Sequence, residues 1–195
     1  MNSADWFAQR QIMDEHFPML TRFGVADADV AIHSHMLSYL ATVGQYFGFA
    51  AVVECPLPVL AGSRFAALGD VRSDVIWFDK QLNVPLVAFE FERFQTRGDE
   101  RKLRHKIENL AITSLRAGNT LQHCFLIYWL RSGTAPQSLK ESRALYRVGF
   151  VRNGVRVPPP HCPLTIVKCV FGWQGEKLLV HDLLFVESSV HSWPT

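Results

Sequence analysis

The 195-residue chain lacks any uninterrupted apolar segment near the ~18 residues that a membrane-spanning helix requires. Residues Met1 to Trp6 also lack the basic start and apolar core of a signal peptide. Cysteine is scarce, and the four cysteines show no short paired spacing; they are Cys55, Cys124, Cys162 and Cys169. The first two stand among apolar or strand-forming residues, as buried thiols do. These absences predict a cytoplasmic protein with no membrane partner.

Motifs of several enzyme classes are missing as well. The chain has no Gly-x-Gly-x-x-Gly sequence, no Walker-type phosphate loop and no serine in a nucleophile elbow. His33 and His35 are two residues apart in a predicted helix, so they do not form a chelating pair. A short zinc spacing is absent from the C-terminal group of His161, Cys162, Cys169 and His181. Because 48% of the residues are hydrophobic, we expect one sizeable core and a single domain over residues 1–195.

Charge is unevenly distributed along the chain, although the net charge is only +2. Residues 1–60 contain six carboxylates against two arginines, whereas residues 131–156 contain six basic residues and one glutamate. A basic segment of this kind indicates a surface for a polyanion such as nucleic acid. It is equally typical of a solvated face that only aids solubility.

The hydrophobic pattern predicts a mixed α/β domain. A helix is expected over residues 27–46 with Asp27 as its N-cap, and another from residue 98 to about 117. Strands are expected over 49–54, 72–79, 85–93 and 121–130. A short amphipathic segment over 5–23 precedes them, and a basic helix over 138–147 and a hairpin over 164–186 follow. We therefore expect an αβββαβ core over about 27–130, with a mixed sheet flanked by helices, and an extension over about 131–195.

Three carboxylates occupy the two strands that should form a hairpin. Side chains alternate between the faces of a strand, so Asp74 shares a face with Ile76, and Glu90 shares one with Glu92. Burying unpaired carboxylates costs several kcal/mol each, and neighbouring like charges raise one another's pKa. A divalent cation makes such a cluster tolerable, and oxygen ligands suit Mg²⁺ or Mn²⁺. The hairpin therefore predicts a metal site.

This element order, with carboxylates on its second and third strands, resembles the PD-(D/E)xK nuclease superfamily, which has the restriction-endonuclease-like fold. Asp74 matches the metal-binding aspartate of the family and is preceded by Ser73 in place of proline. Glu90, Phe91 and Glu92 match the three positions of the (D/E)xK element. Glu92 stands where the family usually has lysine, so the chain carries a Glu-x-Glu variant of the motif.

The resemblance implies a Mg²⁺-dependent nuclease that hydrolyses phosphodiester bonds, with DNA as the expected substrate. The metal ligands that it implies are the side chains of Asp74, Glu90 and Glu54 and the backbone carbonyl of Phe91. Glu92 would orient or deprotonate the attacking water, or help to hold a second ion. In some family members the lysine comes from the following helix, which makes Lys106 the catalytic candidate and Lys102 the alternative.

Basic residues near this helix and in the extension are the expected contacts to nucleic acid. They are Arg97, Arg101, Lys102, Arg104, Arg143 and Arg147. Double-stranded DNA is the expected partner. Since cutting both strands usually requires two active sites, a homodimer is a further expectation.

Two alternatives stay open at this point. Replacement of the usual lysine by Glu92 could leave a catalytically silent, nuclease-like domain that binds nucleic acid or a protein partner. In the other alternative the acidic hairpin is ordinary surface, with Asp74 paired to Arg72 or Arg93 at a strand end. This second alternative predicts that the acidic residues of the three strands do not converge.

Overall fold

A computed structural model of the chain describes residues 9–59, 64–118, 120–131 and 135–188. In these ranges six strands form one sheet in the order β1-β2-β3-β4-β7-β8. The strands are β1 (Ala50–Pro56), β2 (Arg72–Phe78), β3 (Pro85–Arg93), β4 (His123–Leu130), β7 (Leu164–Gln174) and β8 (Lys177–Ser188). The α-helices are α1 (Arg10–His16), α2 (Asp29–Tyr46), α3 (Glu100–Arg116) and α4 (Leu139–Val148). Shorter elements are η2 (Met19–Phe23), η3 (Arg64–Leu68), η4 (Arg97–Asp99) and the two-stranded hairpin of β5 (Phe150–Arg152) and β6 (Val155–Val157).

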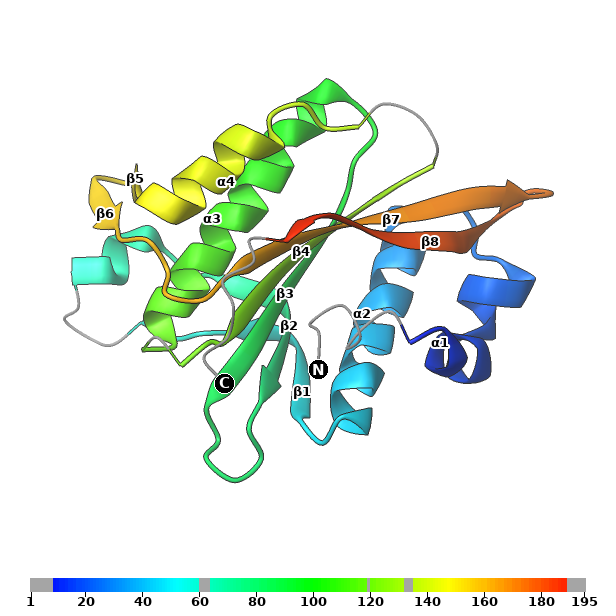
Figure 1. The fold of residues 1–195 in the computed structure, drawn as a ribbon, viewed down its shortest axis with the longest axis horizontal. Helices are drawn as coiled ribbons and strands as arrows, with labels where there is room; N and C mark the ends of the chain where they lie inside the picture. The colour runs from blue at the N-terminus through cyan, green and yellow to red at the C-terminus, as the bar shows by residue number, and fades with distance from the viewer. Residues whose placement is uncertain (1–8, 60–63, 119, 132–134, 189–195) are drawn as a thin grey trace.

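The sheet is mixed. Strands β1, β2 and β3 are antiparallel, β4 runs parallel to both β3 and β7, and β8 returns antiparallel to β7. Helices α1 and α2 lie on one side of the sheet, and α3 and α4 lie on the other (Figure 1). The prediction of a mixed α/β fold with helices flanking a mixed sheet is confirmed. No helix in the described ranges is long and apolar enough to cross a membrane.

Strand β4 is central because its sequence is apolar on both faces. All of its residues are buried. Phe125 and Ile127 pack in the core beneath α2, whereas Leu126 and Tyr128 pack in the core beneath α3. A strand that is covered on both sides has no polar face, as the continuous apolar run predicted.

The C-terminal hairpin belongs to the same sheet as the predicted core. Strand β7 pairs with β4 over seven residues, from Cys124 opposite Leu164 to Leu130 opposite Val170. The predicted extension is therefore continuous with the sheet, and it also contains the β5–β6 hairpin, which the sequence pattern did not predict. Residues 5–8 of the N-terminal segment and residues 132–134 and 189–195 of the extension lie outside the described ranges.

The predicted N-cap of the long N-terminal helix is wrong. Helix α2 begins at Asp29, and its N-cap is Ala28, which makes no side-chain capping bond. The Asp27 carboxylate instead forms ion pairs with Arg93 and Arg131. Two long-range arginine contacts thus take the carboxylate that a local capping bond would have used.

A close approach between Gly44 and Trp77 sets the position of α2 on the sheet. The Trp77 indole Nε1–H donates a hydrogen bond to the Leu40 carbonyl at 3.0 Å. A Cβ atom on Gly44 would lie only 2.5 Å from this Nε1. Glycine at position 44 therefore allows the helix backbone to lie directly on the indole ring, which no larger residue permits without movement.

We expect Gly44→Ala to destabilise the protein by roughly 1–3 kcal/mol through overpacking against Trp77. This loss would exceed the gain of about 1 kcal/mol that alanine normally brings over glycine inside a helix. Urea unfolding measures the difference. The matched control is Gln45→Ala, at an exposed position of the same helix, which should stay within about 0.5 kcal/mol of the wild type. A stabilised Gly44→Ala protein would contradict the close approach.

His123 is buried at the start of β4. Its Nε2 lies 2.8 Å from the Thr165 hydroxyl, and its ring stacks on Phe125 with centroids 4.2 Å apart. Burial lowers the pKa of His123 to about 4, because the charged imidazolium would lose its hydration there. The folded protein therefore holds this histidine neutral at pH values where the unfolded chain protonates it.

This difference predicts a pH-dependent stability. Between pH ~6.5 and ~4 the unfolded state binds the extra proton, so the free energy of unfolding falls as the pH falls through this window. The His123 contribution should reach about 3 kcal/mol at the lower end and be constant above pH ~6.5. Urea unfolding across this range, compared with His123→Gln, measures it. Equal pH slopes in the two proteins would refute the assignment.

Candidate metal centre

Asp74 of β2, Glu90 of β3 and Lys106 of α3 meet on the α3 face of the sheet. The Lys106 ammonium lies 2.9 and 3.0 Å from the two Asp74 oxygens and 2.6 Å from Glu90 Oε2. Asp74 is 4% exposed and Glu90 is fully buried. The alternation that placed both carboxylates on one face, and the helical stripe that carries Lys106, thus bring three charged groups into one buried cluster.

Strands β2 and β3 separate at this point. Their ladder ends at the pair Val75 and Phe89, so that Asp74, the residue that precedes Val75 in β2, lies just beyond the ladder. Beyond the ladder, the Phe91 backbone N–H donates to Asp74 Oδ2 at 2.6 Å. A side-chain carboxylate has replaced the strand carbonyl as the acceptor, which keeps a buried N–H satisfied. The main chain of Phe91 therefore lies beside Asp74, and the metal-ligand role of its carbonyl stays a prediction.

The three charges have displaced pKa values. Burial alone would raise the pKa of Asp74, but the neighbouring His33 imidazole, the Lys106 charge and the Phe91 N–H lower it to about 2. Burial and the Asp74 charge raise the pKa of Glu90 well above its usual range, against the opposing effect of Lys106. Burial would lower the pKa of Lys106, but the two carboxylates outweigh it and raise that pKa. Asp74 and Lys106 are thus held charged, while Glu90 resists ionisation.

The buried cluster has more acidic groups than cationic ones. The Lys106 ammonium forms ion pairs with two carboxyl groups, those of Asp74 and Glu90. Within the described structure, neither Glu90 oxygen makes a hydrogen bond of regular geometry. Such a buried carboxyl group gains from a further cation or proton. Of this cluster, Asp74 also belongs to a group of side chains that could hold a metal ion.

His33 and Glu54 extend the cluster on its other side. One ligand atom from each of His33, Glu54 and Asp74 lies within 4.8 Å of the others, which is close enough to hold a metal ion. Glu54 and Asp74 both lie between the β1–β2 pairs Val53–Val75 and Cys55–Ser73, and like charges this close repel each other. Glu54 also has a left-handed backbone with φ of 53°, a strained conformation for a residue within a strand. A cation between the two carboxylates would relieve the repulsion.

The sequence analysis missed His33. The spacing of His33 and His35 predicts no chelating pair, which stays a prediction, but His33 Nε2 lies 3.7 Å from Asp74 Oδ2. The signal was its place on α2, because His33 begins the stripe that continues with Leu37, Leu40 and Gly44, all of which are buried. A histidine at the end of a buried stripe indicates a polar partner.

Glu92 lies outside the group formed by His33, Glu54 and Asp74. It is half-buried, and its Oε1 accepts the N–H of Arg93 at 3.2 Å. Burial raises the pKa of Glu92, although the charges of Lys106 and Lys102 oppose the effect. A carboxylate with a raised pKa is suited to accept a proton near neutral pH. The predicted role in activating water is therefore compatible with its surroundings and stays a prediction.

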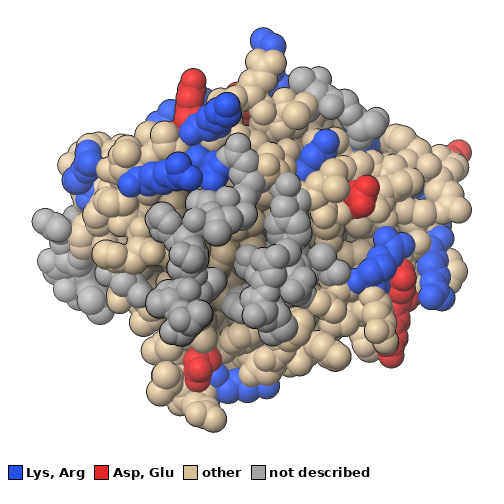
Figure 2. Space-filling model, in the orientation of Figure 1, with Lys and Arg blue, Asp and Glu red and all other residues tan. Residues whose placement is uncertain are grey.

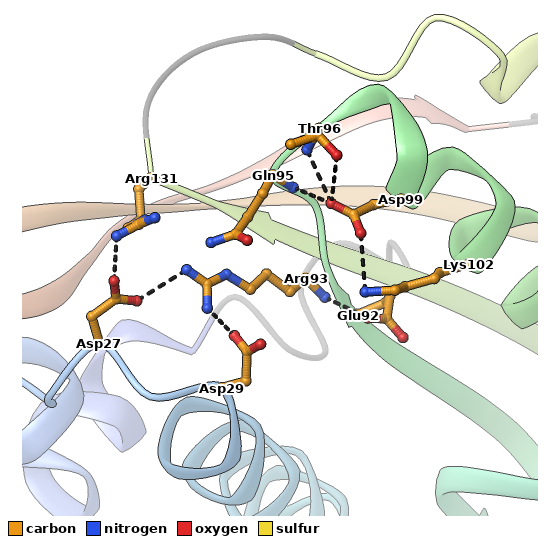
Figure 3. A network of polar contacts seen from close by, with 9 residues as sticks. All are labelled: Asp27, Asp29, Glu92, Arg93, Gln95, Thr96, Asp99, Lys102 and Arg131. Atoms are coloured by element: carbon orange, nitrogen blue, oxygen red, sulfur yellow. Dashed lines mark hydrogen bonds and ion pairs between the residues drawn. The ribbon is translucent and has the colours of Figure 1, made fainter.

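A hollow of about 230 Å³ opens beside Glu92. It is lined by Asp29, Val30, His33, Ser34, Phe91, Glu92, Arg93 and Trp129. Arg93 forms ion pairs with Asp27 and Asp29 (Figure 3). Its guanidinium also lies 4.7 Å from the centre of the Trp129 ring. This network ties the end of β3 to the start of α2, the helix that carries His33. The hollow is thus a preformed space next to the candidate ligands.

The runner-up lysine, Lys102, lies outside the buried cluster. Its ammonium pairs with Asp99 at 3.0 Å, and its side chain is 59% exposed.

Glu54 has an ion-pair partner of its own, because Arg72 Nε lies 2.5 Å from its Oε2. Arg72 and Arg93 therefore pair with other carboxylates than Asp74. Asp74 is 4% exposed and Glu90 is fully buried, so neither is an ordinary surface residue. Of the four acidic residues expected to converge, Glu54 and Asp74 come within metal-bridging reach, together with His33, and Glu90 and Glu92 are outside that group.

The predicted nucleic-acid contacts lie on η4, α3 and α4. Arg97, Arg101, Arg104 and Arg147 are exposed, and Arg143 is half-buried. Arg104 pairs with Glu108 on its own helix at 3.0 Å. Lys and Arg side chains gather toward the upper left of Figure 2, over the region of α3 and α4. This basic surface lies on the same side of the sheet as Lys106, and its binding role stays a prediction.

Comparisons with known proteins do not identify the chain, because no protein-family model, no curated protein and no solved structure matches it.

We expect Lys106→Met to lower the free energy of unfolding by about 3–5 kcal/mol, since it leaves two buried carboxyl groups without their cation. The matched control is Lys102→Met on the same helix, where loss of an exposed ion pair should cost at most about 1 kcal/mol. Urea unfolding at pH 7 distinguishes them. Adding Glu90→Gln to Lys106→Met should recover part of the loss. Equal stability of the two single variants would contradict the buried cluster.

Proposed function

We propose that this protein is a divalent-metal-dependent nuclease with a restriction-endonuclease-like fold, which hydrolyses phosphodiester bonds of double-stranded DNA. The observation that carries the proposal is the position of Lys106. The Glu-x-Glu sequence lacks the lysine of the (D/E)xK element, and α3 brings an ammonium to within 3.0 Å of Asp74 and Glu90. If catalysis is retained in the Glu-x-Glu variant, the lysine must come from another element, as it does in family members whose lysine lies on the following helix.

The topology supports the same proposal. Helix α2 precedes the antiparallel strands β1, β2 and β3, and α3 connects β3 to the parallel strand β4. This is the αβββαβ order expected from the resemblance. Asp74 and Glu90 lie where the β2–β3 ladder ends, and His33, Phe91 and Glu92 line the hollow beside them.

The ligand set favours Mn²⁺ over Mg²⁺. Asp74, Glu54 and His33 would hold the ion, with Glu90 as a further carboxylate beside Lys106. Carboxylates suit both ions, whereas an imidazole nitrogen suits Mn²⁺ and later transition metals better than Mg²⁺. A bound divalent ion polarises the phosphate and lowers the pKa of water.

The other charged residues have distinct roles in this proposal. Lys106 keeps its proton because its pKa is raised, so its ammonium can stabilise the negative charge that develops on the phosphate. Glu92, at the edge of the hollow, orients the attacking water or accepts its proton. The arginines of α3 and α4 hold the DNA backbone. Two copies of the chain would cut both strands.

A second candidate function is a nuclease-like domain that binds nucleic acid or a protein partner without cleavage. The specific observation in its favour is that Lys106 already neutralises part of the acidic cluster. A lysine that bridges two carboxylates can hold the fold together without any metal.

Cleavage of supercoiled plasmid in the presence of Mn²⁺ or Mg²⁺ tests the proposal. We expect nicking that requires the metal, is faster with Mn²⁺, and is lost in Glu90→Ala and Asp74→Asn. The matched control is Asp70→Asn, an exposed aspartate outside the cluster, which should cleave like the wild type. Folded wild-type protein that binds DNA but does not cleave it with either ion would favour the silent domain.

The contribution of His33 has a separate readout. We expect His33→Ala to weaken Mn²⁺ binding at least about 10-fold while weakening Mg²⁺ binding less, because the imidazole favours the transition metal. Isothermal titration of the folded protein with each ion measures both affinities without any substrate. The control is His35→Ala on the same helix, which should bind both ions like the wild type. An unchanged Mn²⁺ affinity in His33→Ala would remove His33 from the ligand set.

A further inference from the structure

Two of the four cysteines are in contact in the core beneath α3. Cys124 Sγ lies 3.6 Å from Cys162 Sγ. Cys124 begins the buried run of β4 and is fully buried, whereas Cys162 precedes β7 and is 5% exposed. The Cys124 N–H donates to the Pro163 carbonyl at 3.0 Å, which joins the two segments next to the sulfur atoms. The thiols are thus held side by side by the sheet itself.

Hydroxyl groups surround the Cys162 sulfur. The Tyr146 hydroxyl of α4 lies 3.2 Å from this sulfur and donates to the Cys162 carbonyl at 3.2 Å. The Ser114 hydroxyl of α3 lies 3.6 Å from the same sulfur. A hydrogen bond that the sulfur accepts favours its thiolate form. The Cys124 thiol and these two hydroxyls lower the pKa of Cys162 below its usual value, against the effect of burial.

The two sulfurs therefore differ in character. Burial raises the pKa of Cys124 well above its usual value, so its thiol keeps the proton. Both residues are buried, Cys162 at 5% exposure, and Cys162 is the more acidic of the two. An acidic thiol beside a second thiol that can resolve its oxidised form is one feature of redox-active cysteines.

We propose that Cys124 and Cys162 form a redox-active dithiol, which hydrogen peroxide converts to an intramolecular disulfide. The Cys162 thiolate attacks one peroxide oxygen, the O–O bond breaks, and the leaving hydroxide takes a proton to become water. The Cys162 sulfenic acid that results is attacked by the Cys124 sulfur. The S–O bond breaks as the S–S bond forms, and the hydroxide that leaves takes the Cys124 proton. The two sulfurs lose two electrons in total, and the peroxide gains them.

The geometry limits the movement that this reaction needs. The sulfurs must approach from 3.6 Å to about 2.05 Å, and Cys162 lies in the connector between β6 and β7 rather than inside a strand. The new bond would close a loop that contains α4 and the β5–β6 hairpin. Closing a loop restricts the unfolded chain, so the oxidised protein should unfold at a higher temperature than the reduced one.

Mass spectrometry of the full chain tests the proposal independently of any nuclease activity. The reduced, folded protein is treated with hydrogen peroxide, its remaining thiols are alkylated, and its intact mass and non-reducing peptide map are measured. We expect a decrease of about 2 Da before alkylation, two alkylated thiols in place of four, and one cross-link that joins Cys124 to Cys162. Dithiothreitol should reverse all three changes.

Cysteine variants assign the order of the steps. In Cys124→Ser, oxidation should stop at a Cys162 sulfenic acid that dimedone traps, whereas Cys162→Ser should give neither product. Cys55→Ser and Cys169→Ser are matched controls that should still form the cross-link. Four alkylated thiols after peroxide treatment of the folded wild type, or a cross-link that involves Cys55 or Cys169, would overturn the proposal. The wild-type peptide map decides the question even if a variant fails to fold.

Discussion

The buried contact of Lys106 with Asp74 and Glu90 is the interaction on which the rest of the structure depends. It joins α3 to two neighbouring strands at the point where they separate. Without the ammonium, two carboxyl groups would be buried without a cation. The free-energy cost of burying them would not be offset by the apolar packing around them. The contact therefore constrains how β2, β3 and α3 pack together. It also determines which charged groups are available at the end of the β2–β3 ladder.

A second set of charges fixes the opposite side of the site. Arg93 and Arg131 converge on Asp27, and Arg93 also reaches Asp29, so the start of α2 is tied to the ends of β3 and β4 (Figure 3). Helix α2 carries His33 toward Asp74 from the face of the sheet opposite α3. The candidate metal centre is thus assembled from both layers, and its geometry depends on the sheet between them.

The same ammonium gives the site its two possible functions. In the protein alone, Lys106 offsets the negative charge of the carboxylates. In a nuclease it would also be placed to stabilise charge that develops on a phosphate, because a preorganised cation needs no rearrangement during the reaction. A silent binding domain and an active enzyme therefore share this arrangement, and only metal-dependent chemistry separates them.

Local sequence determined the elements and the faces of their side chains. Strand alternation placed Asp74 and Glu90 together, and the helical stripe of α3 placed Lys106 near them, because both periodicities follow from backbone geometry. Only the tertiary structure decided that His33 joins Asp74, that Asp27 pairs with arginines instead of capping α2, and that the C-terminal hairpin completes the sheet. These outcomes depend on which strands are neighbours and how a helix crosses them. The helical stripe indicates that His33 has a polar partner, but periodicity alone does not tell which residue that partner is.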